Sequence, residues 1–143
     1  MQHDDKPVIL LVDDEKAILD GYMLALRREA YEILTAVSPV EALKILATRR
    51  VDVVVSDERM PEMLGSDFLR QVRMRWPRVV RILLTGQTDI QTTTHAIREG
   101  QLYRFLSKPL GPGDLALTLR QALEMQQVLE GHARLRASGS HVS

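Results

Sequence analysis

The stretch Val51-Asp52-Val53-Val54-Val55-Ser56-Asp57 decides the fold of this 143-residue chain. Its valines form an almost continuous apolar run, which is typical of a parallel strand covered by helices on both faces. Asp57 follows this run directly, and Met60-Pro61 comes soon after it, so the strand gives way to a loop at a carboxylate. Such a carboxylate either caps a turn or takes part in chemistry, and only its neighbours in the fold can decide between the two.

Four other runs have the character of strands, and helical patterns separate them. They are Val8–Val12, Glu32–Ala36, 79–84 and 103–106, with the opening run counted as 51–56. Glu32–Ala36 alternates apolar with polar or smaller residues, as an edge strand does. The alternation of strands and helices is typical of βαβ units, so we predict an α/β fold with a doubly wound, five-stranded parallel sheet and five helices.

Apolar residues at helical spacing predict which faces of the helices are buried. The first helix would bury Ile18, Tyr22, Ala25 and Leu26. Ser38 would cap the second helix, with Pro39 in its first turn and Glu41 three residues after the cap. The buried face of that second helix would consist of Val40, Leu43, Leu46 and Ala47. The third helix would bury Phe68, Leu69, Val72 and Trp76.

The last two helices differ in their expected stability. A helix over 89–99 contains Thr92, Thr93 and Thr94, and β-branched residues are poor helix formers. The last helix begins near Pro112, and its apolar pattern continues to about Leu135 despite Gly131. We therefore expect an N-terminal tail over 1–7, one folded domain over 8–129, and a C-terminal extension or linker over 130–143, with a linker-like tail from Ala137.

The composition excludes several classes of protein. Lys plus Arg and Asp plus Glu number 19 each, so the net charge is zero and nothing points to nucleic-acid or membrane binding through bulk charge. The chain has no cysteine, which excludes disulfides and thiolate metal sites. Its first residues are unlike a secretory signal. No apolar run approaches the ~20 residues that span a bilayer, and we expect a cytoplasmic protein.

Polar groups follow four of the predicted strands. Asp13 and Asp14 follow the first, Asp57 the third, Thr85 the fourth and Lys108-Pro109 the fifth. Each group alone is more often a cap or a turn, but together they would meet at the carboxyl edge of the sheet, where such folds bind ligands. Three acids and one lysine leave two negative charges, and all-oxygen ligands favour Mg²⁺ over Zn²⁺. A carboxylate beside Mg²⁺ and an ammonium group can attack a phosphorus centre.

These motifs resemble those of response-regulator receiver domains, the phosphoacceptor modules of two-component signalling. The matching strings are Leu11-Val12-Asp13-Asp14-Glu15, Ser56-Asp57-Glu58-Arg59-Met60-Pro61, Leu84-Thr85-Gly86 and Leu106-Ser107-Lys108-Pro109. The resemblance implies a flavodoxin-like strand order 2-1-3-4-5 and a switch that does not turn over an external substrate. It implies that Asp57 accepts a phosphoryl group from a sensor histidine kinase or a phosphotransfer protein.

The resemblance also assigns roles to the other residues. Asp14 and Asp57 would bind Mg²⁺ (or Mn²⁺) directly, Asp13 through water, and Arg59 through its backbone carbonyl. Lys108 would pair with the phosphoryl group, Pro109 would follow a cis bond, and Thr85 would act as the switch hydroxyl. Phe105 stands where many members of the family have a tyrosine, so its coupling to Thr85 would rest on packing alone. Arg59 and Gln87 border the phosphoryl group in the family, and we expect them to set its lifetime.

Other functions stay open on the sequence alone. A phosphatase of the haloacid-dehalogenase type also uses Asp, Lys, Thr and Mg²⁺, but its nucleophile would have to follow the first strand, where the chain reads Asp13-Asp14-Glu15-Lys16. A receiver that serves only as an interaction module is a third reading. The resemblance extends to receivers attached to HD-GYP phosphodiesterases or nitrogen-regulator-type activators, so the chain is either a free-standing receiver or a fragment whose output domain lies beyond it. A homodimer would form through the helix 4–strand 5–helix 5 face or the extended last helix.

Overall fold

The computed structural model describes residues 6–86, 97–98, 102–111 and 113–142, and side chains through residue 128. The elements follow one another as β1 (Val8–Val12), α1 (Lys16–Ala25), β2 (Glu32–Ala36), α2 (Pro39–Thr48), β3 (Val53–Asp57), α3 (Gly65–Arg75), β4 (Val80–Thr85), β5 (Arg104–Ser107) and α5 (Asp114–Val142). The helix expected over 89–99, with its three threonines, lies outside the described residues apart from 97–98.

The five strands form one parallel sheet in the order β2-β1-β3-β4-β5. This confirms the doubly wound, flavodoxin-like order and the edge position of β2. Strands β1 and β2 have the predicted bounds, whereas β3, β4 and β5 each begin and end later in the chain than predicted. The shift has a consequence for the site, because Asp57 and Thr85 become the last residues of their strands instead of the first residues of loops.

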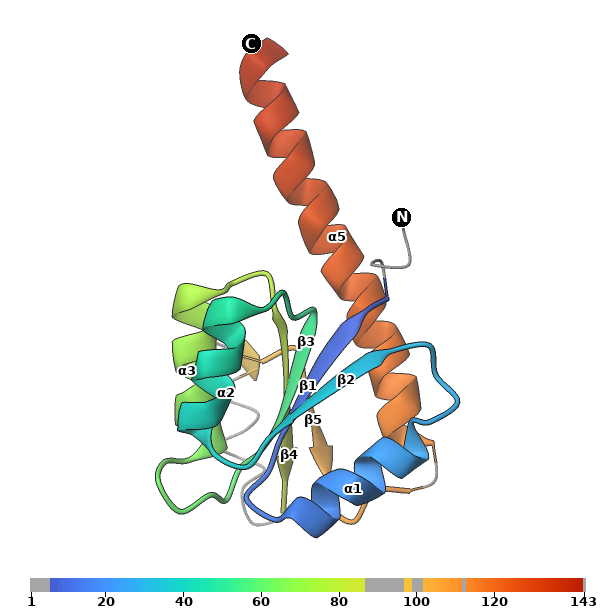
Figure 1. Ribbon diagram of the computed structural model, residues 1–143. Helices are drawn as coiled ribbons and strands as arrows, with labels where there is room; N and C mark the ends of the chain where they lie inside the picture. The colour runs from blue at the N-terminus through green and yellow to red at the C-terminus, as the bar shows by residue number, and fades with distance from the viewer. Residues whose placement is uncertain (1–5, 87–96, 99–101, 112, 143) are drawn as a thin grey trace.

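The two faces of the sheet carry separate apolar cores. Leu10, Val54 and Leu83 point to the face where α2 and α3 pack, and Phe68 of α3 is fully buried there. Ile9, Val55 and other alternate strand residues point to the opposite face, against α1 and α5. Figure 1 shows α2 and α3 on one side of the sheet and α1 and α5 on the other. The sheet is therefore covered on both sides, as its nearly continuous apolar strands require.

The predicted buried faces of α1 and α2 were partly wrong. In α1 the buried residue is Leu19, while Ala25 is exposed. In α2 the buried residues are Pro39, Ala42 and Leu46, while Val40 is 51% exposed and Ala47 is also exposed. Both helices carry apolar residues on more than one face, so helical spacing alone could not select the face that meets the sheet. The cap of α2 was correct, since the Glu41 N–H donates to Ser38 Oγ at 3.1 Å.

Helix α5 continues well beyond the sheet. It runs from Asp114 to Val142. The tail from Ala137, which was expected to be linker-like, is therefore helical as far as Val142. Leu115, Leu119 and Ala122 bury one face of its first half against the sheet. Figure 1 shows the second half projecting from the body on the side of the N-terminus. Within the described part of the chain, no helix is both long and apolar enough to cross a membrane.

Candidate functional site: an acidic pocket at the carboxyl edge of the sheet

The register of the sheet brings four predicted site residues to one edge. Ser56 pairs with Val12, and Asp57 pairs with Leu84, so Asp13, directly after β1, and Asp57, the last residue of β3, lie at adjacent strand ends. Thr85 pairs with Ser107, which places Lys108 directly after the last pair of the next two strands. The carboxyl ends of parallel strands are where doubly wound sheets bind ligands, so the predicted groups meet where such chemistry is expected.

The three acids form a tight cluster. One carboxylate oxygen from each of Asp13, Asp14 and Asp57 lies within 4.8 Å of the others. Asp13 and Asp57 are buried, with exposures of 1% and 6%, while Asp14 is exposed. Burial raises the pKa of Asp13, the Glu15 N–H lowers it and the charge of Asp57 raises it again. Without a cation, the cluster is electrostatically unfavourable.

One oxygen of Asp13 lacks a partner. Its Oδ1 accepts the Glu15 N–H at 2.9 Å. Its Oδ2 is buried and has no hydrogen-bond partner among the residues that the structure describes. A buried, unpaired carboxylate oxygen beside two other carboxylates fits a hard divalent cation, because such ions take oxygen ligands and compensate the negative charge. The residues present therefore suit Mg²⁺ in both donor type and charge.

Lys108 supplies the positive charge of the pocket. Its Nζ forms an ion pair with Asp57 Oδ1. Burial lowers the pKa of Lys108, but the hydrogen bond and charge of Asp57, aided by Tyr22 and Asp13, outweigh it and raise the pKa above its ordinary value. Lys108 is thus a cation held on the Asp57 carboxylate. The bond between Lys108 and Pro109 is cis, as predicted.

A cavity of about 350 Å³ opens over these groups, and its lining includes Asp14, Asp57, Arg59, Thr85 and Lys108. Thr85 is 1% exposed, and its hydroxyl donates to the Gly86 carbonyl at 3.2 Å. Gln87, the second predicted tuning residue, lies outside the described residues. The cavity is large enough for a small ligand, and it places a carboxylate, an ammonium group and a hydroxyl around one space.

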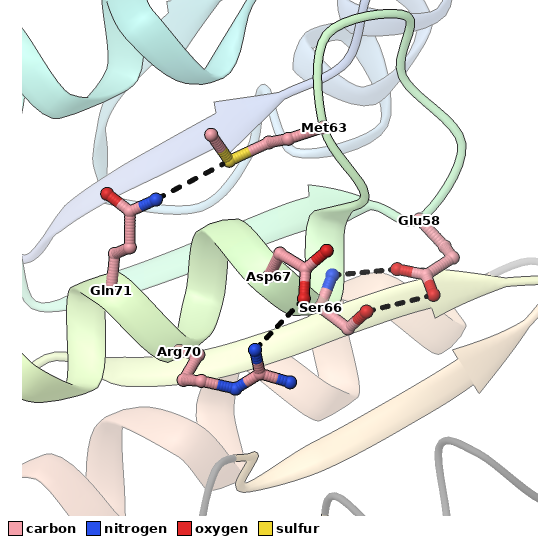
Figure 2. A network of polar contacts seen from close by, with 6 residues as sticks. All are labelled: Glu58, Met63, Ser66, Asp67, Arg70 and Gln71. Atoms are coloured by element: carbon pink, nitrogen blue, oxygen red, sulfur yellow. Dashed lines mark hydrogen bonds and ion pairs between the residues drawn. The ribbon is translucent and has the colours of Figure 1, made fainter.

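The loop that follows Asp57 is held by Glu58, a contact that the sequence did not predict. The Ser66 N–H donates to Glu58 Oε1 at 2.7 Å, and the Ser66 hydroxyl donates to Oε2 at 3.0 Å. Figure 2 shows this carboxylate facing the first turn of α3, where Leu64 at the N-cap provides no side-chain acceptor. The Glu58 N–H also donates to the Leu84 carbonyl at 2.9 Å. Glu58 therefore joins the end of β3 to both β4 and α3.

Gly65 closes the same loop at the start of α3. A Cβ atom at this position would overlap the backbone carbonyl oxygen of Asp57 and would lie 2.9 Å from Ser56 Oγ. The Gly65 N–H donates to the Glu58 carbonyl at 2.9 Å. The absence of a side chain therefore lets α3 begin directly against the phosphoacceptor candidate, which is a close approach that only glycine permits.

Phe105 lies on the same face of the sheet as Thr85. It pairs with Leu83, and both belong to the core under α2 and α3. Thr85 is two residues beyond Leu83 in β4, so strand alternation points its side chain to that face as well. Phe105 is only partly buried. Its ring has no hydrogen-bonding group, so packing is the only way in which it can sense a change at Thr85.

The fold and the pocket define a class: a doubly wound α/β domain with an acidic, lysine-bearing site at the carboxyl edge of its sheet. Comparison with known families adds that the response regulator receiver domain matches residues 9–120. The chain belongs to the receiver domains of two-component signalling response regulators.

Three similar proteins illustrate the relationship. The hydrogenase transcriptional regulatory protein HoxA of Cupriavidus necator is 40% identical over 126 residues, which cover 86% of this chain and 25% of HoxA. The signal receiver domain of an HD domain-containing protein from Pseudomonas fluorescens is 40% identical, with a TM-score of 0.81 and coverage of 88% of this chain and 93% of that one. A chain described as adenylate cyclase from Rhodopirellula baltica is 30% identical, with a TM-score of 0.88 and coverage of 92% and 98%.

Two points follow from these comparisons. The chain spans about a quarter of the length of the curated relatives HoxA from two organisms. The family match favours a receiver over a phosphatase of the haloacid-dehalogenase type. The geometry agrees, because the lysine pairs with Asp57 at the end of β3 and not with an acid after β1.

Proposed function

We propose that Asp57 accepts a phosphoryl group from a phosphohistidine of a sensor histidine kinase or a phosphotransfer protein, and that the chain works as a phosphorylation-controlled switch. The ion pair between Lys108 and Asp57 carries this proposal. It singles out one of three clustered carboxylates, and that carboxylate lines a cavity that a phosphoryl group can enter. Asp13 and Asp14 lie beside it, and among the described residues neither forms an ion pair with a lysine or arginine.

The chemistry follows from the charges of the pocket. An Asp57 carboxylate oxygen attacks the phosphorus, the phosphorus–nitrogen bond of the donor breaks, and its electron pair returns to the imidazole, which takes up a proton. The product is an acyl phosphate with about −1.5 to −2 charge. Lys108 moves from the carboxylate to the phosphoryl oxygens, where its charge is needed as negative charge accumulates. The chain assists this transfer and its reversal by water, and it turns over no external substrate.

Asp13, Asp14, Asp57 and the backbone carbonyl of Arg59 would hold the Mg²⁺ ion, for which Mn²⁺ could substitute. When bound, the ion neutralises charge on the phosphoryl oxygens. The buried, unpaired Oδ2 of Asp13 and the oxygen-only donor set support this assignment. The Glu58–Ser66 contact supports the role of Arg59, because it fixes the residue directly before that carbonyl.

The direct test uses a small phosphodonor. Acetyl phosphate with Mg²⁺ should add one phosphoryl mass to the protein, and the adduct should be absent from Asp57→Ala and after removal of the metal with EDTA. Asp14→Ala should retain Asp57 but gain mass much more slowly. A phosphoryl adduct on Asp57→Ala that maps to another residue would contradict the assignment.

Thr85 and Phe105 would pass the change to the output surface. The hydroxyl of Thr85 turns from the Gly86 carbonyl to a phosphoryl oxygen, and the space that it leaves is filled by movement of Phe105. A few kcal/mol of differential contact is enough to reverse such a two-state population. Phe105→Ala should keep phosphorylation by acetyl phosphate but lose the phosphorylation-dependent change in hydrogen exchange across β4 and β5.

Arg59 and Gln87 would set the lifetime of the acyl phosphate. Arg59 lines the cavity, and both residues are near in sequence to the groups that would contact the phosphoryl group. Changing both to alanine should alter the dephosphorylation rate of the isolated, phosphorylated protein severalfold. The matched control is Arg28→Ala, which removes an exposed arginine elsewhere. An unchanged rate in the double variant would contradict this role.

The remaining assignments concern the surroundings of the switch. The curated relatives include transcriptional regulatory proteins, and one solved relative comes from an HD domain-containing protein. We therefore propose that the chain controls an output domain of one of these kinds from the cytoplasm. A homodimer would form through the α5 surface, either beside β5 or along the projecting part of the helix. Sedimentation with and without phosphorylation tests this association.

A further inference from the structure

A second cavity lies at the opposite end of the sheet from the acidic pocket. It has a volume of about 340 Å³, and its apolar wall includes Leu46, Val51 and Val79 together with Trp76. These residues come from the end of α2, the approach to β3 and the segment between α3 and β4. Figure 1 shows that this end of the sheet is the one where α5 leaves the body. The volume is within the range of small-molecule sites, and phosphoryl chemistry does not use it.

Gln126 of α5 gives the cavity a polar group without a partner. It lines the cavity and is only 6% exposed. Within the described part of the chain, no hydrogen bond joins its amide to another residue. The Gln126 amide is not among the fully enclosed, unpaired polar groups of the described residues, so it stays accessible to a ligand that offers it a polar atom. Gln126 is also the last buried side chain described in α5.

The rim of the cavity is positively charged. Arg49, Arg50 and Arg78 line it. Arg49 pairs with Glu32 at 2.6 Å and Arg50 pairs with Asp52 at 3.0 Å, whereas Arg78 has no acidic partner among the described residues. The rim therefore keeps one uncompensated guanidinium group next to an apolar wall.

Neighbouring arginines increase this excess of positive charge. The guanidinium carbon of Arg75 lies 4.6 Å from the centre of the Trp76 ring. Burial lowers the pKa of Arg81 to about 10, and the like charge of Arg73 contributes to that shift. An anion at this end of the sheet would relieve the crowding of like charges.

We propose that this cavity binds a small amphipathic carboxylate, with its apolar body against Leu46, Val79 and Trp76, its carboxylate facing Arg78, and a carboxylate oxygen accepting from the Gln126 amide. Each part of the ligand matches a part of the site: the hydrocarbon body packs on the apolar wall, the carboxylate compensates the positive rim, and a carboxylate oxygen accepts a hydrogen bond from the amide. A bound ligand would contact α5 at its last described buried residue. The site is distinct from the phosphoacceptor and does not depend on Asp57.

The experiment titrates the protein with 3-phenylpropanoate and, separately, with the neutral isostere 3-phenylpropanamide. Trp76 is the single tryptophan of the chain, so its fluorescence reports directly on the cavity. The acid should change this fluorescence saturably and shift the NMR signals of the Gln126 side-chain amide and the Val51 and Val79 methyls. The amide should bind at least about tenfold more weakly, which corresponds to the loss of one charge-assisted contact.

Matched variants separate the parts of the site. Arg78→Gln should weaken binding of the acid about tenfold and leave binding of the amide unchanged. Gln126→Leu should weaken both ligands, since both offer an acceptor. Arg28→Gln removes the same charge outside the cavity and should bind like the wild type, as should Asp57→Ala. Equal affinity for acid and amide, or shifts that map away from these residues, would overturn the proposal; so would a lack of saturation.

Discussion

Strand β3 has a buried aspartate near each end, and the two carboxylates differ in the partners that surround them. Asp52, just before the strand, is 3% exposed; its Oδ2 accepts the Val8 N–H at 2.8 Å and its Oδ1 pairs with Arg50 at 3.0 Å. Asp57, the last residue of the strand, is 6% exposed and shares its surroundings with two further carboxylates. Each oxygen of the Asp52 carboxylate has a partner. Asp57, in contrast, belongs to a cluster of three carboxylates whose negative charge Lys108 compensates only in part.

The difference separates a structural acid from a functional one. Backbone bonds strengthen the structural role of Asp52, because its N–H donates to the Val8 carbonyl and its carbonyl accepts from Val80, so it ties three strands together where they begin. The acids at the other end repel one another and leave one oxygen of Asp13 unpaired. Burial alone therefore does not identify a site, whereas burial with unmet charge does.

The largest expected effect is a loss of stability when Asp52, just before β3, is replaced. Asp52→Ala leaves the Val8 N–H and Arg50 without their acceptor and should lower the free energy of unfolding by about 3 kcal/mol. Urea unfolding, followed by circular dichroism, measures this loss. Asp57→Ala is the matched change at the other end, and its effect should stay below about 1 kcal/mol because Lys108 can turn to solvent. Equal losses in the two variants would contradict the distinction.

The next effect concerns the start of α3. Gly65→Ala should lower stability by about 2 kcal/mol and slow phosphorylation, since the added methyl group overlaps the Asp57 carbonyl and must displace the strand end. Gly21→Ala is the control, because a Cβ there meets nothing within 4 Å and α1 should gain about 0.5–1 kcal/mol. A Gly65→Ala protein as stable and as reactive as the wild type would disprove the close-approach argument.

A smaller loss is expected from the loop contact. Ser66→Ala removes the hydroxyl that donates to Glu58 but keeps the backbone N–H bond, so stability should fall by about 1 kcal/mol. If Glu58 positions the Arg59 carbonyl, the variant should also bind Mg²⁺ severalfold more weakly, as isothermal calorimetry would measure. Ser66→Thr should restore both values. A stability loss without a change in Mg²⁺ affinity would leave the contact a purely structural cap.

The smallest expected effect is a gain in the free energy of unfolding, and it comes from replacing Asp13. Burial raises the pKa of Asp13 above its ordinary 3.8, so the folded state binds this proton more tightly than the unfolded state does. In EDTA, the stability of the wild type relative to that of Asp13→Asn should fall as pH rises from 3.8 through the raised pKa, because the variant lacks this titrating group. At neutral pH the variant should be more stable by about 1 kcal/mol yet bind Mg²⁺ more weakly. A destabilised Asp13→Asn would show that the acid cluster is not under strain.

The sequence predicted the strands well because their signal is local. Val8–Val12 is a continuous apolar run and Glu32–Ala36 an alternating one, and the sheet has both at those bounds. The ends of the other strands shifted because an aspartate or a threonine can close a strand as well as open a loop. Ala25, Val40 and Ala47 were misassigned to buried faces because the choice among several apolar faces is made by the sheet, which is distant in sequence.

The site could be predicted in part for the same reason. Strand order and chain direction bring Asp13, Asp57, Thr85 and Lys108 to one edge, whatever the details of packing. The partner of Glu58 could not be predicted, because Ser66 lies across a loop whose path no spacing rule fixes. Its only sequence signal is a glycine followed by Ser66 and Asp67 at a helix start, next to an N-cap residue, Leu64, whose side chain cannot accept a hydrogen bond.

The long last helix also has a mechanical consequence. At 1.5 Å per residue, the 29 residues of α5 form a rod roughly 43 Å in length, held to the body along only its first half. Such a rod is a lever: a rotation of about 5° at its anchored half would carry its free tip through roughly 2 Å, by the geometry of a rod of this length. Small repacking beneath Leu115 and Leu119 would thus be magnified with distance along the helix, so the tip would be displaced far more than the packed half.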